Sequence, residues 1–585
     1  EKAKSHYFQA FWKSLNKFGS YYQIIARHNG KCLNVNGGTS NDNERIIQYP
    51  CVGADNELWT IKPSSDAYQI IAKHSNKCLN ISGASTADSA KAIQSQCAGA
   101  SSERFSLRVL PAPTSPLATK GQWSSVINLP LVPVAAATLP DGKVLFWSAY
   151  DRYAFGGSSG QTYTALFNPS TNQTTEKLVT ETGHDMFCPG TTMLSDGRLL
   201  VNGGSNAEVT SLYNFSNNTW TRDANMNIPR GYNSTVTLSN GSAFTLGGSW
   251  SGGQGGKHGE VWTSGSGWRR PANTLVDPII GYEDIYRSDN HSWLFSSDNG
   301  RVFYAGPGNR MQWYDTNGNG SVTFAGNRGD DTYSQNGNAV MFAPGKILKA
   351  GGAAAYERQP ANPRSYVIDI NGGVTTKAVG SLSYARAFAN AVVLADGGVM
   401  IVGGMPNPVV FSDTNAVLTP ELWSPRTEQW TQLANHQIAR TYHSVALLLP
   451  DGRVLAGGGG LCGGCGVNHP DAEIFSPPYL FTSSGGLASR PVISTAPTSV
   501  GYGQTFNVTL ASGRWASGFH LVRLSSLTHS VNNDQRFISL DYGGGAGNYT
   551  LTAPANSGIA PGGYYMLFAL DSQGVPSVAK IIRLG

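Results

Sequence analysis

Short apolar stretches joined by tight polar turns recur along most of the chain. In TTMLSDGRLLVNGGS, which begins at Thr191, two strand-like segments flank an Asp-Gly pair, and the second segment ends in Gly-Gly. Asp-Gly and Asn-Gly supply the positive φ that a two-residue turn requires, so each such unit predicts a β-hairpin. Six further copies follow this pattern: AAATLPDGKVLFWS from 135, STVTLSNGSAFTLGGS from 234, WLFSSDNGRVFYAGPG from 293, NAVMFAPGKILKAGGA from 338, NAVVLADGGVMIVGGM from 390 and SVALLLPDGRVLAGGG from 444.

Seven hairpin-centred units at a spacing of about fifty residues predict a seven-bladed kelch β-propeller. Such a ring leaves no long strand edge exposed, and its loops converge on a central axis. We therefore expect any functional site to lie on that axis.

The first hundred residues contain a different repeat. YYQIIARHNGKCLNVNGG (21–38) returns as YQIIAKHSNKCLNISGA (68–84), and in each copy a second cysteine follows nineteen residues after the first. With NELW at 56–59, the repeat resembles the ricin-type β-trefoil lectin family. The sugar-binding aspartate of that family is replaced by Asn34 and Asn80, and only the first copy keeps an aromatic residue, Tyr49, beside its second cysteine. The resemblance implies a lectin-like module that either binds polysaccharide or forms a structural cap.

The last hundred residues predict a third domain. Alternating segments such as QTFNVTLAS and YYMLFALDS, separated by Pro and Gly turns, indicate an immunoglobulin-like β-sandwich. The expected organisation is a β-trefoil-like module over 1–110, a Pro-rich joint, a propeller over 121–487 and a sandwich over 488–585. The predicted fold class is all-β, which agrees with 70 glycines and only 14% charged residues.

Charge and composition exclude several partners. The net charge of +5 is spread along the chain without a block of like charge, so we expect no nucleic-acid or anionic-membrane partner. No run of eighteen apolar residues occurs, and residues 1–20 lack the apolar stretch of a signal peptide. Sequons at Asn172, Asn507 and Asn548 favour an oxidising compartment. We expect a processed, secreted, extracellular monomer.

Six of the seven cysteines form local pairs: Cys32 with Cys51, Cys78 with Cys97, and Cys462 with Cys465. Three disulfides support secretion. For Cys462-Gly-Gly-Cys465, a redox-active pair or half of a zinc site are alternatives, but no second pair lies nearby, which favours a structural disulfide. Cys188 remains, and an odd cysteine in such a protein indicates an intermolecular bridge, a buried inert thiol or special chemistry.

Separate motifs between 120 and 585 resemble the galactose oxidase family of copper-radical oxidases, in the order of that family. They are HDMFCPG with Cys188, PRGY with Tyr232, GGSW with Trp250, YRSDNH with Arg287, ARTYHS with Tyr442 and His443, GGGGLCGGC with Cys462 and Cys465, and LTHSVNND with His529.

This resemblance implies one copper ion bound by Tyr232, Tyr442, His443 and His529. Two imidazoles and two phenols suit Cu(II), which prefers nitrogen and oxygen ligands in a tetragonal arrangement. The resemblance also implies a thioether between Cys188 and the Tyr232 ring. His529 would reach the propeller axis from the third domain.

The implied catalytic residues are Tyr232, Cys188, Tyr442 and Trp250. Oxidation of a primary alcohol to an aldehyde removes two electrons, whereas Cu(II) accepts one, so a Tyr232 radical would be the second acceptor. Tyr442 would be the general base, and the Trp250 indole would shield the radical. Dioxygen would then be reduced to hydrogen peroxide, without an organic cofactor.

The substrate is less defined. The resemblance implies that Arg287, Phe155, Phe411 and Glu357 bind it, with Glu357 in place of the glutamine of galactose oxidase. A carboxylate accepts hydrogen bonds but cannot donate them, and it could pair with Arg287 instead. Galactosides and benzylic or aliphatic primary alcohols remain open, and Trp250 favours galactose-oxidase-like enzymes over glyoxal oxidases.

Two alternatives to an alcohol oxidase remain: a non-catalytic carbohydrate-binding kelch protein, and an aldehyde-oxidising enzyme of the glyoxal oxidase type. Three further histidines lie inside or just after these motifs but are not metal ligands in the family. We interpret them as structural residues or as neighbours that support the metal ligands: His184, His291 and His469.

Overall fold

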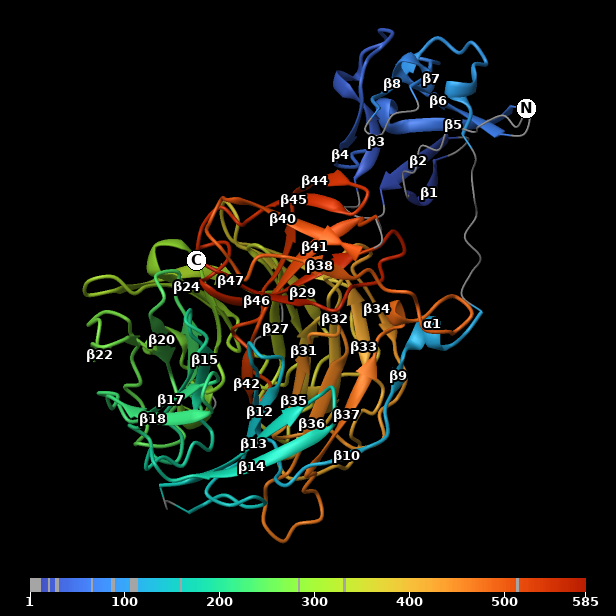
Figure 1. The fold of residues 1–585 in the computed structure, drawn as a ribbon. Helices are drawn as coiled ribbons and strands as arrows, with labels where there is room; N and C mark the ends of the chain where they lie inside the picture. Colours follow the sequence, from blue (N-terminus) through green and yellow to red (C-terminus); the bar gives the residue numbers. More distant parts are fainter. Residues whose placement is uncertain are drawn as a thin grey trace. The chain divides into compact units, whose positions relative to one another are not determined.

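A computed structural model of the protein describes residues 12–18, 21–26, 31–64, 67–85, 90–105, 114–157, 160–281, 285–329, 333–511 and 515–585. The chain forms two compact units, Glu1–Ala112 and Pro113–Gly585, which Figure 1 colours from blue to red along the sequence. The α-helices of the described residues are the short α1 (Leu117–Lys120) and α2 (Ile285–Ser288). Within the same residues, no helix has the length and apolar character needed to cross a membrane.

The first unit consists of two similar copies of three strands within one eight-stranded sheet. Ile25 pairs with Cys32 in the first copy, and Ile71 pairs with Cys78 at the matching place in the second. The expected disulfides Cys32–Cys51 and Cys78–Cys97 are both present. The strands are β1 (Trp12–Phe18), β2 (Tyr21–Ala26), β3 (Cys32–Val35), β4 (Ile46–Tyr49), β5 (Leu58–Ser64), β6 (Ala67–Ala72), β7 (Cys78–Ile81) and β8 (Ala92–Ser95).

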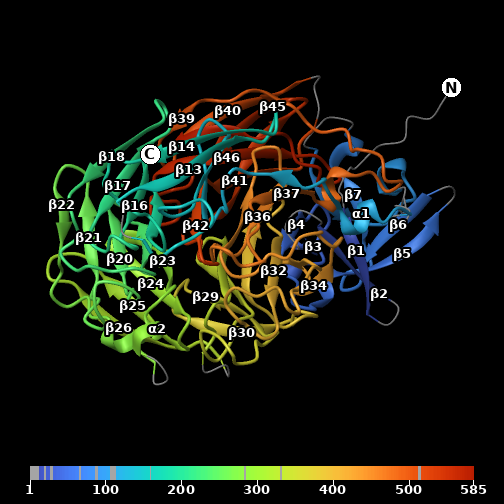
Figure 2. The same cartoon turned by 90° about the horizontal axis from the view of Figure 1, so that it is seen from below.

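The predicted hairpins form seven antiparallel sheets among the described residues of the second unit, arranged as a ring in Figure 2. The first four blades contain β11 (Ala135–Thr138), β12 (Val144–Trp147), β13 (Thr162–Asn168), β14 (Gln173–Val179); β15 (Gly190–Met193), β16 (Leu199–Asn202), β17 (Thr210–Asn214), β18 (Thr219–Asp223); β19 (Ser234–Thr237), β20 (Ala243–Leu246), β21 (Glu260–Thr263), β22 (Gly267–Arg269); and β23 (Trp293–Ser296), β24 (Arg301–Gly306), β25 (Arg310–Asp315), β26 (Ser321–Asn327).

The last blade closes the ring with strands from both ends of the propeller sequence. β9 and β10 precede the first blade but pair with β37 of the seventh. The remaining strands are β27 (Asn338–Ala343), β28 (Lys346–Ala350), β29 (Ser365–Asp369), β30 (Thr375–Val379); β31 (Ala387–Val393), β32 (Val399–Met405), β33 (Glu421–Ser424), β34 (Gln429–Gln432); and β35 (Ser444–Leu448), β36 (Val454–Gly458), β37 (Asp471–Ser476), β9 (Gln122–Trp123), β10 (Ile127–Asn128).

The Gly-Gly pairs allow neighbouring blades to approach closely. Gly203 has a φ of 76°, and a Cβ there would lie 2.4 Å from the carbonyl oxygen of Arg230 in the next blade. Gly403 has a φ of 74°, and its Cβ would lie 2.0 Å from the carbonyl oxygen of Arg440. Only glycine fits such contacts. Each arginine lies two residues ahead of a tyrosine of the expected metal site. The close contacts at these glycines therefore help to set the position of the backbone that leads into each tyrosine.

The C-terminal domain consists of two sheets and sends one strand into the propeller. β42 (Ser526–Thr528) extends the first blade, where Ala135 pairs with Thr528. Because His529 follows β42 directly, this pairing delivers it to the ring. The other strands are β38 (Ile493–Thr495), β40 (Thr505–Leu510), β44 (Tyr542–Gly545), β45 (Asn548–Thr552); and β39 (Ser499–Val500), β41 (Gly518–Arg523), β43 (Phe537–Leu540), β46 (Gly563–Leu570), β47 (Lys580–Leu584).

The segment after His529 binds several blades at once. Asn533 Oδ1 accepts from the Leu294 amide at 3.1 Å, and Gln535 Oε1 accepts from the Val393 amide at 2.9 Å. Asp534 Oδ2 accepts from the Met193 amide at 2.8 Å. These buried side chains satisfy amides of three different blades. We call residues 532–536 the central plug.

Candidate metal centre

One backbone position in the repeat supplies side chains of different chemistry. Cys188, Tyr232 and His291 each lie two residues ahead of the first strand of their blade, with φ values of 60°, 64° and 56°. His443 has a φ of 70° at the start of the seventh blade. A left-handed backbone costs a non-glycine residue roughly 1–2 kcal/mol, and such positions cluster at functional sites. The repeat thus brings Cys, Tyr and His to corresponding places in the ring.

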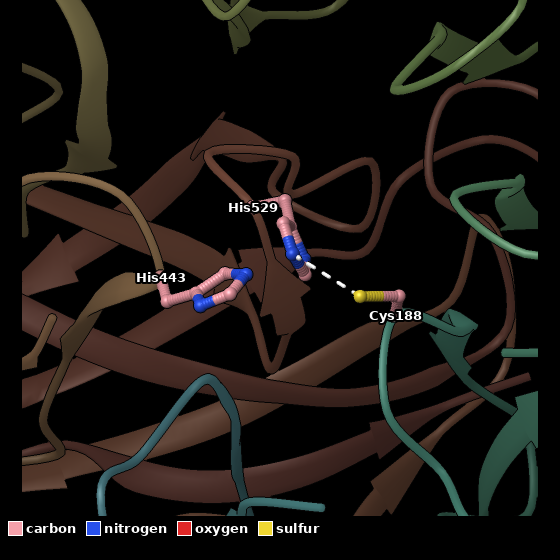
Figure 3. Close-up of side chains that lie close together, drawn as sticks. All are labelled: Cys188, His443 and His529. Carbon is pink, nitrogen blue, oxygen red and sulfur yellow. Dashed lines mark hydrogen bonds between the residues drawn. The ribbon is translucent and has the colours of Figure 1, made fainter. Parts of the chain in front are cut away.

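Cys188, His443 and His529 form a buried cluster. Their ligand atoms all lie within 4.8 Å of one another. Figure 3 shows the three side chains pointing toward one another. The Sγ of Cys188 lies 3.5 Å from Nε2 of His529. Burial raises the pKa of the Cys188 thiol well above its usual value, so the sulfur carries its proton.

The two imidazoles are neutral, and each has one unprotonated nitrogen whose lone pair could bind a metal. Burial lowers the pKa of His443 to about 3 and places that of His529 well below 6.5. Nδ1 of His443 donates to the Gly460 carbonyl, which leaves Nε2 with a lone pair. Nδ1 of His529 lies 2.6 Å from Thr528 Oγ1, whose own proton goes to the Val134 carbonyl. Nδ1 is therefore the donor there too, and Nε2 of His529 is unprotonated.

The two expected tyrosine ligands meet beside these histidines. The hydroxyl groups of Tyr232 and Tyr442 are in hydrogen-bond contact. Burial raises the pKa of both phenols well above 10. The Trp250 indole stacks on the Tyr232 ring with centroids 4.8 Å apart and planes inclined by 22°. The backbone amide of Tyr232 donates to the Cys188 carbonyl at 2.7 Å, which places the two residues side by side.

This donor set fits a copper ion. Nε2 of His443 is buried and has no hydrogen-bond partner within the described part of the chain. A buried acceptor without a partner costs about 1–3 kcal/mol, which a bound cation would offset. Two neutral imidazole nitrogens and two phenol oxygens are the ligand types that Cu(II) prefers.

The expected substrate residues surround this centre. Phe155 stacks on Phe411 at 5.5 Å, and Phe411 meets the edge of Tyr442 at 5.3 Å. Phe155 is 36% exposed, so this aromatic wall reaches solvent. The Arg287 guanidinium lies over the Tyr356 ring, 4.2 Å from its centroid.

Glu357 lies beside the same wall. Its Oε2 accepts from the Val410 amide at 3.4 Å and lies 3.9 Å from Nε of Arg358. The carboxylate therefore has an arginine neighbour in its own loop. The ion pair between Glu357 and Arg287 stays a prediction.

Sequence reasoning missed Tyr356 and Phe187. The Tyr356 hydroxyl lies 3.1 Å from that of Tyr442 and 3.1 Å from Nε2 of His291. Phe187 contacts both Trp250 and Phe155, with ring centroids 5.7 and 4.9 Å apart. Each had a neighbour that the sequence singled out, since Phe187 precedes the odd cysteine and Tyr356 precedes Glu357.

The three histidines interpreted as structural lie in different surroundings. His184 is buried between Ser211 Oγ and the Gly203 carbonyl, each at 2.8 Å. His469 lies 2.8 Å from Asp413. His291 stacks on His529 with centroids 5.0 Å apart, so it belongs to the centre although it is not among the expected ligands. The expected Cys462–Cys465 disulfide is present.

Two families match parts of the chain. The ricin-type beta-trefoil lectin domain-like family matches residues 8–107. The galactose oxidase-like, early set domain family matches residues 490–584.

Longer similarities cover the propeller as well. Galactose oxidase of Gibberella zeae is 44% identical over 488 residues, which are 80% of this chain and 72% of that protein. A solved structure described as a novel fungal alcohol oxidase with catalytic diversity among the AA5 family, in complex with copper, is 40% identical with a TM-score of 0.77. The match covers 79% of this chain and 99% of that one. Aldehyde oxidase GLOX1 of Arabidopsis thaliana is 30% identical over 240 residues, 37% of this chain and 38% of the relative.

Proposed function

This chain belongs to the galactose oxidase family and is a copper-dependent alcohol oxidase, and we propose that Tyr232, Tyr442, His443 and His529 bind its copper ion. The observation that carries this assignment is the convergence of two neutral imidazoles and two contacting phenols. We also propose that Cys188 and Tyr232 are joined by a thioether in the mature enzyme. The buried thiol, the single unpaired cysteine among the described residues, supports that link.

Bound copper supplies a one-electron acceptor and acidifies the oxygen atoms that approach it. The Tyr442 oxygen takes the hydroxyl proton of the alcohol, and its contact with Tyr356 at 3.1 Å holds this oxygen in place. The oxidised Tyr232 oxygen takes the hydrogen of the carbinol carbon, and Trp250 excludes water from that ring. In total the alcohol loses two electrons and two protons to become an aldehyde, and dioxygen takes them up as hydrogen peroxide.

We propose that the preferred substrates are primary alcohols with an apolar or aromatic group, rather than galactose alone. The stacked Phe155 and Phe411 rings offer an apolar surface that reaches solvent. Glu357 can accept but not donate hydrogen bonds, which reduces the pairing available to a sugar rich in hydroxyl groups.

A peroxide assay with galactose, benzyl alcohol, butanol and methylglyoxal tests these proposals. We expect peroxide from the three alcohols, with benzyl alcohol highest in kcat/KM and methylglyoxal lowest. A preference for methylglyoxal would support the aldehyde-oxidising alternative. No peroxide from any compound, in protein that binds copper, would support a non-catalytic kelch protein.

For the N-terminal module, we propose that the first copy of the repeat, which contains Tyr49, is the part that binds polysaccharide. Tyr49 is 51% exposed and pairs in register with Cys32, where the second copy has Ser95 opposite Cys78. Exposed aromatic rings provide stacking surface for sugars. Co-sedimentation with insoluble polysaccharide should fall in Tyr49→Ala and stay unchanged in Ser95→Ala. Equal binding by both variants would favour a structural cap.

Secretion and a monomeric state remain predictions. The three disulfides support an oxidising compartment. Recovery of the protein from culture medium tests secretion. Light scattering of the recovered protein tests the monomeric state, for which we expect the mass of one chain.

A further inference from the structure

The loop that carries Trp250 is rich in glycine, and side-chain contacts hold its first half: Ser251 Oγ donates to the Gly204 carbonyl at 2.7 Å, and Ser249 Oγ accepts from the Gly255 amide at 3.0 Å. It joins β20 to β21 and contains Gly252, Gly253, Gly255 and Gly256, all with φ values between 63° and 87°. A Cβ added at Gly253, Gly255 or Gly256 would meet nothing within 4 Å. Glycine loses more conformational freedom on ordering than any other residue, so such a loop needs an external constraint.

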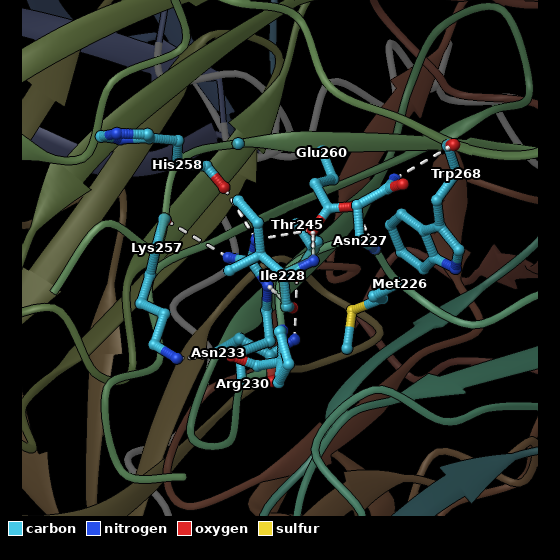
Figure 4. A network of polar contacts seen from close by, with 12 residues as sticks. Met226, Asn227, Ile228, Arg230, Asn233, Thr245, Lys257, His258, Glu260 and Trp268 are labelled. Atoms are coloured by element: carbon cyan, nitrogen blue, oxygen red, sulfur yellow. Dashed lines mark hydrogen bonds and ion pairs between the residues drawn. The ribbon is translucent and has the colours of Figure 1, made fainter. Parts of the chain in front are cut away.

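Lys257 ends this loop and supplies that constraint. Its side chain is 2% exposed, and Nζ donates to the Ser251 carbonyl at 3.1 Å, to the Gly252 carbonyl at 2.8 Å and to the Pro229 carbonyl. An ammonium group has three donors, and all three are used here. Figure 4 shows Lys257 beside Arg230. The ammonium thus joins the start of the Trp250 loop to the segment that leads into Tyr232.

Charged groups of both signs surround Lys257. Arg230 donates to the Lys257 carbonyl at 3.2 Å and pairs with Glu260 at 3.0 Å. The Asp289 carboxylate accepts from Ser249 Oγ at 2.6 Å, just ahead of Trp250. Burial, together with the positive charge of Arg230, lowers the pKa of Lys257 to about 8, and the Asp289 carboxylate opposes both effects. Keeping an ammonium here is therefore costly, and the three carbonyl contacts offset that cost.

The ring contains an internal comparison. Buried Arg–Glu pairs recur as Arg386–Glu421 at 2.7 Å and Arg440–Glu473 at 3.2 Å. Three residues ahead of these glutamates lie Leu418 and Pro470, where the Trp250 blade has Lys257. The blade architecture thus forms without the lysine, which is found in the blade whose loop covers Tyr232.

We propose that Lys257 is a positioning residue that holds the Trp250 indole over the Tyr232 ring. Without the ammonium, the glycine-rich loop moves away from the ring and admits water to Tyr232. The expected effect on the lifetime of oxidised Tyr232 rests on the proposed function. The role of Lys257 in positioning the loop does not depend on that function.

The first measurement is hydrogen exchange of residues 249–257 in the copper-free protein, for Lys257→Met and Lys257→Arg. Lys257→Met removes all three donors, and the loss of even one hydrogen bond from a charged group predicts exchange at least about tenfold faster. Lys257→Arg, which keeps donors, should lie between this variant and the wild type. Lys349→Met is the matched control, because Lys349 is equally buried on β28 of another blade. It should leave exchange of the loop unchanged.

The second measurement is the decay of oxidised Tyr232 in the copper-loaded protein, followed optically. Lys257→Met should shorten this lifetime severalfold. Its copper stoichiometry and its melting temperature are compared with those of Lys349→Met, which serves as the reference. Unchanged loop exchange in a folded Lys257→Met, or equal acceleration in Lys349→Met, would overturn the proposal. If wild-type protein formed no oxidised tyrosine, the proposed function would fail, and the exchange measurement would still decide the role of Lys257.

Discussion

The Trp250 indole lies nearly parallel to the Tyr232 ring, with centroids 4.8 Å apart and planes inclined by 22°. Stacking of this kind is worth about 0.5–1.5 kcal/mol and keeps water off one face of the phenol. Replacement by a smaller ring, Trp250→Phe, should shorten the lifetime of oxidised Tyr232 without changing copper affinity. Optical decay after oxidation measures the lifetime. Trp262→Phe is the control, because Trp262 is buried in the same blade on β21. Equal lifetimes in Trp250→Phe and wild type would show that the indole does not shield the tyrosine.

The central plug should determine how well His529 is placed. Asp534 accepts from Thr192 Oγ1 at 2.6 Å, from the Met193 amide and from Arg523 at 2.7 Å. Asp534→Asn leaves the Arg523 guanidinium without its carboxylate, and outer contacts of a metal site typically change affinity about 10–100-fold. We expect copper affinity to fall within this range, measured by competition with a chelator. Asp541→Asn, at an exposed position of the same domain, should have no effect. An unchanged affinity in Asp534→Asn would contradict this role of the plug.

Glu357 should restrict the use of galactose. Glu357→Gln adds donors where the wild type has only acceptors, and one new hydrogen bond predicts up to about tenfold higher kcat/KM for galactose. Benzyl alcohol should respond little. Glu428→Gln, which alters an exposed pair with Lys377, is the control. A loss of galactose activity in Glu357→Gln would indicate that the carboxylate itself binds the sugar.

Asp185 should make stability depend on pH. Burial raises its pKa from 3.8 to about 7, against contacts from Ser205 and the backbone of Phe187 and Tyr150. Between these values the folded state binds more protons than the unfolded chain, so stability falls as pH rises from 4 to 7, by up to about 1.4 kcal/mol per pH unit.

The variant Asp185→Asn cannot titrate at this position and should lose that part of the pH dependence. Urea unfolding at pH 5 and pH 7.5 measures it. His184 acts in the opposite direction, because burial lowers its pKa to about 4, so stability falls as pH falls from 6.5 to 4. If the free energy of unfolding changed with pH in the same way in wild type and Asp185→Asn, Asp185 would not ionise in this pH range.

The repeat in the sequence was enough to predict the propeller, because Asp-Gly turns and Gly-Gly pairs reflect local backbone requirements. Gly203 shows this, since its φ of 76° lies in the left-handed region that favours glycine. The odd cysteine and the Tyr-His pair at 442–443 likewise have signals that are visible in the chain. The expected ligand set itself came from the family resemblance, because a Tyr-His pair beside a strand is by itself usually structural.

Other features depend on contacts that a sequence does not display. The partners of Lys257 are backbone carbonyls, which every residue possesses, so nothing in the side-chain pattern indicates them. Tyr356 reaches Tyr442 from a different blade, 86 residues away. The pairing of β42 with β11 joins residues separated by most of the chain, and only the fold shows that His529 arrives through it.

Peptide mass mapping of copper-matured protein tests the central claim most directly. We expect the peptides that contain Cys188 and Tyr232 to be recovered as one linked species, lighter by two hydrogens than their sum. Cys188→Ser should abolish the link while keeping copper binding. Separate, unmodified peptides from protein that was loaded with copper under oxygen would contradict the assignment of Cys188 and Tyr232 as the radical cofactor.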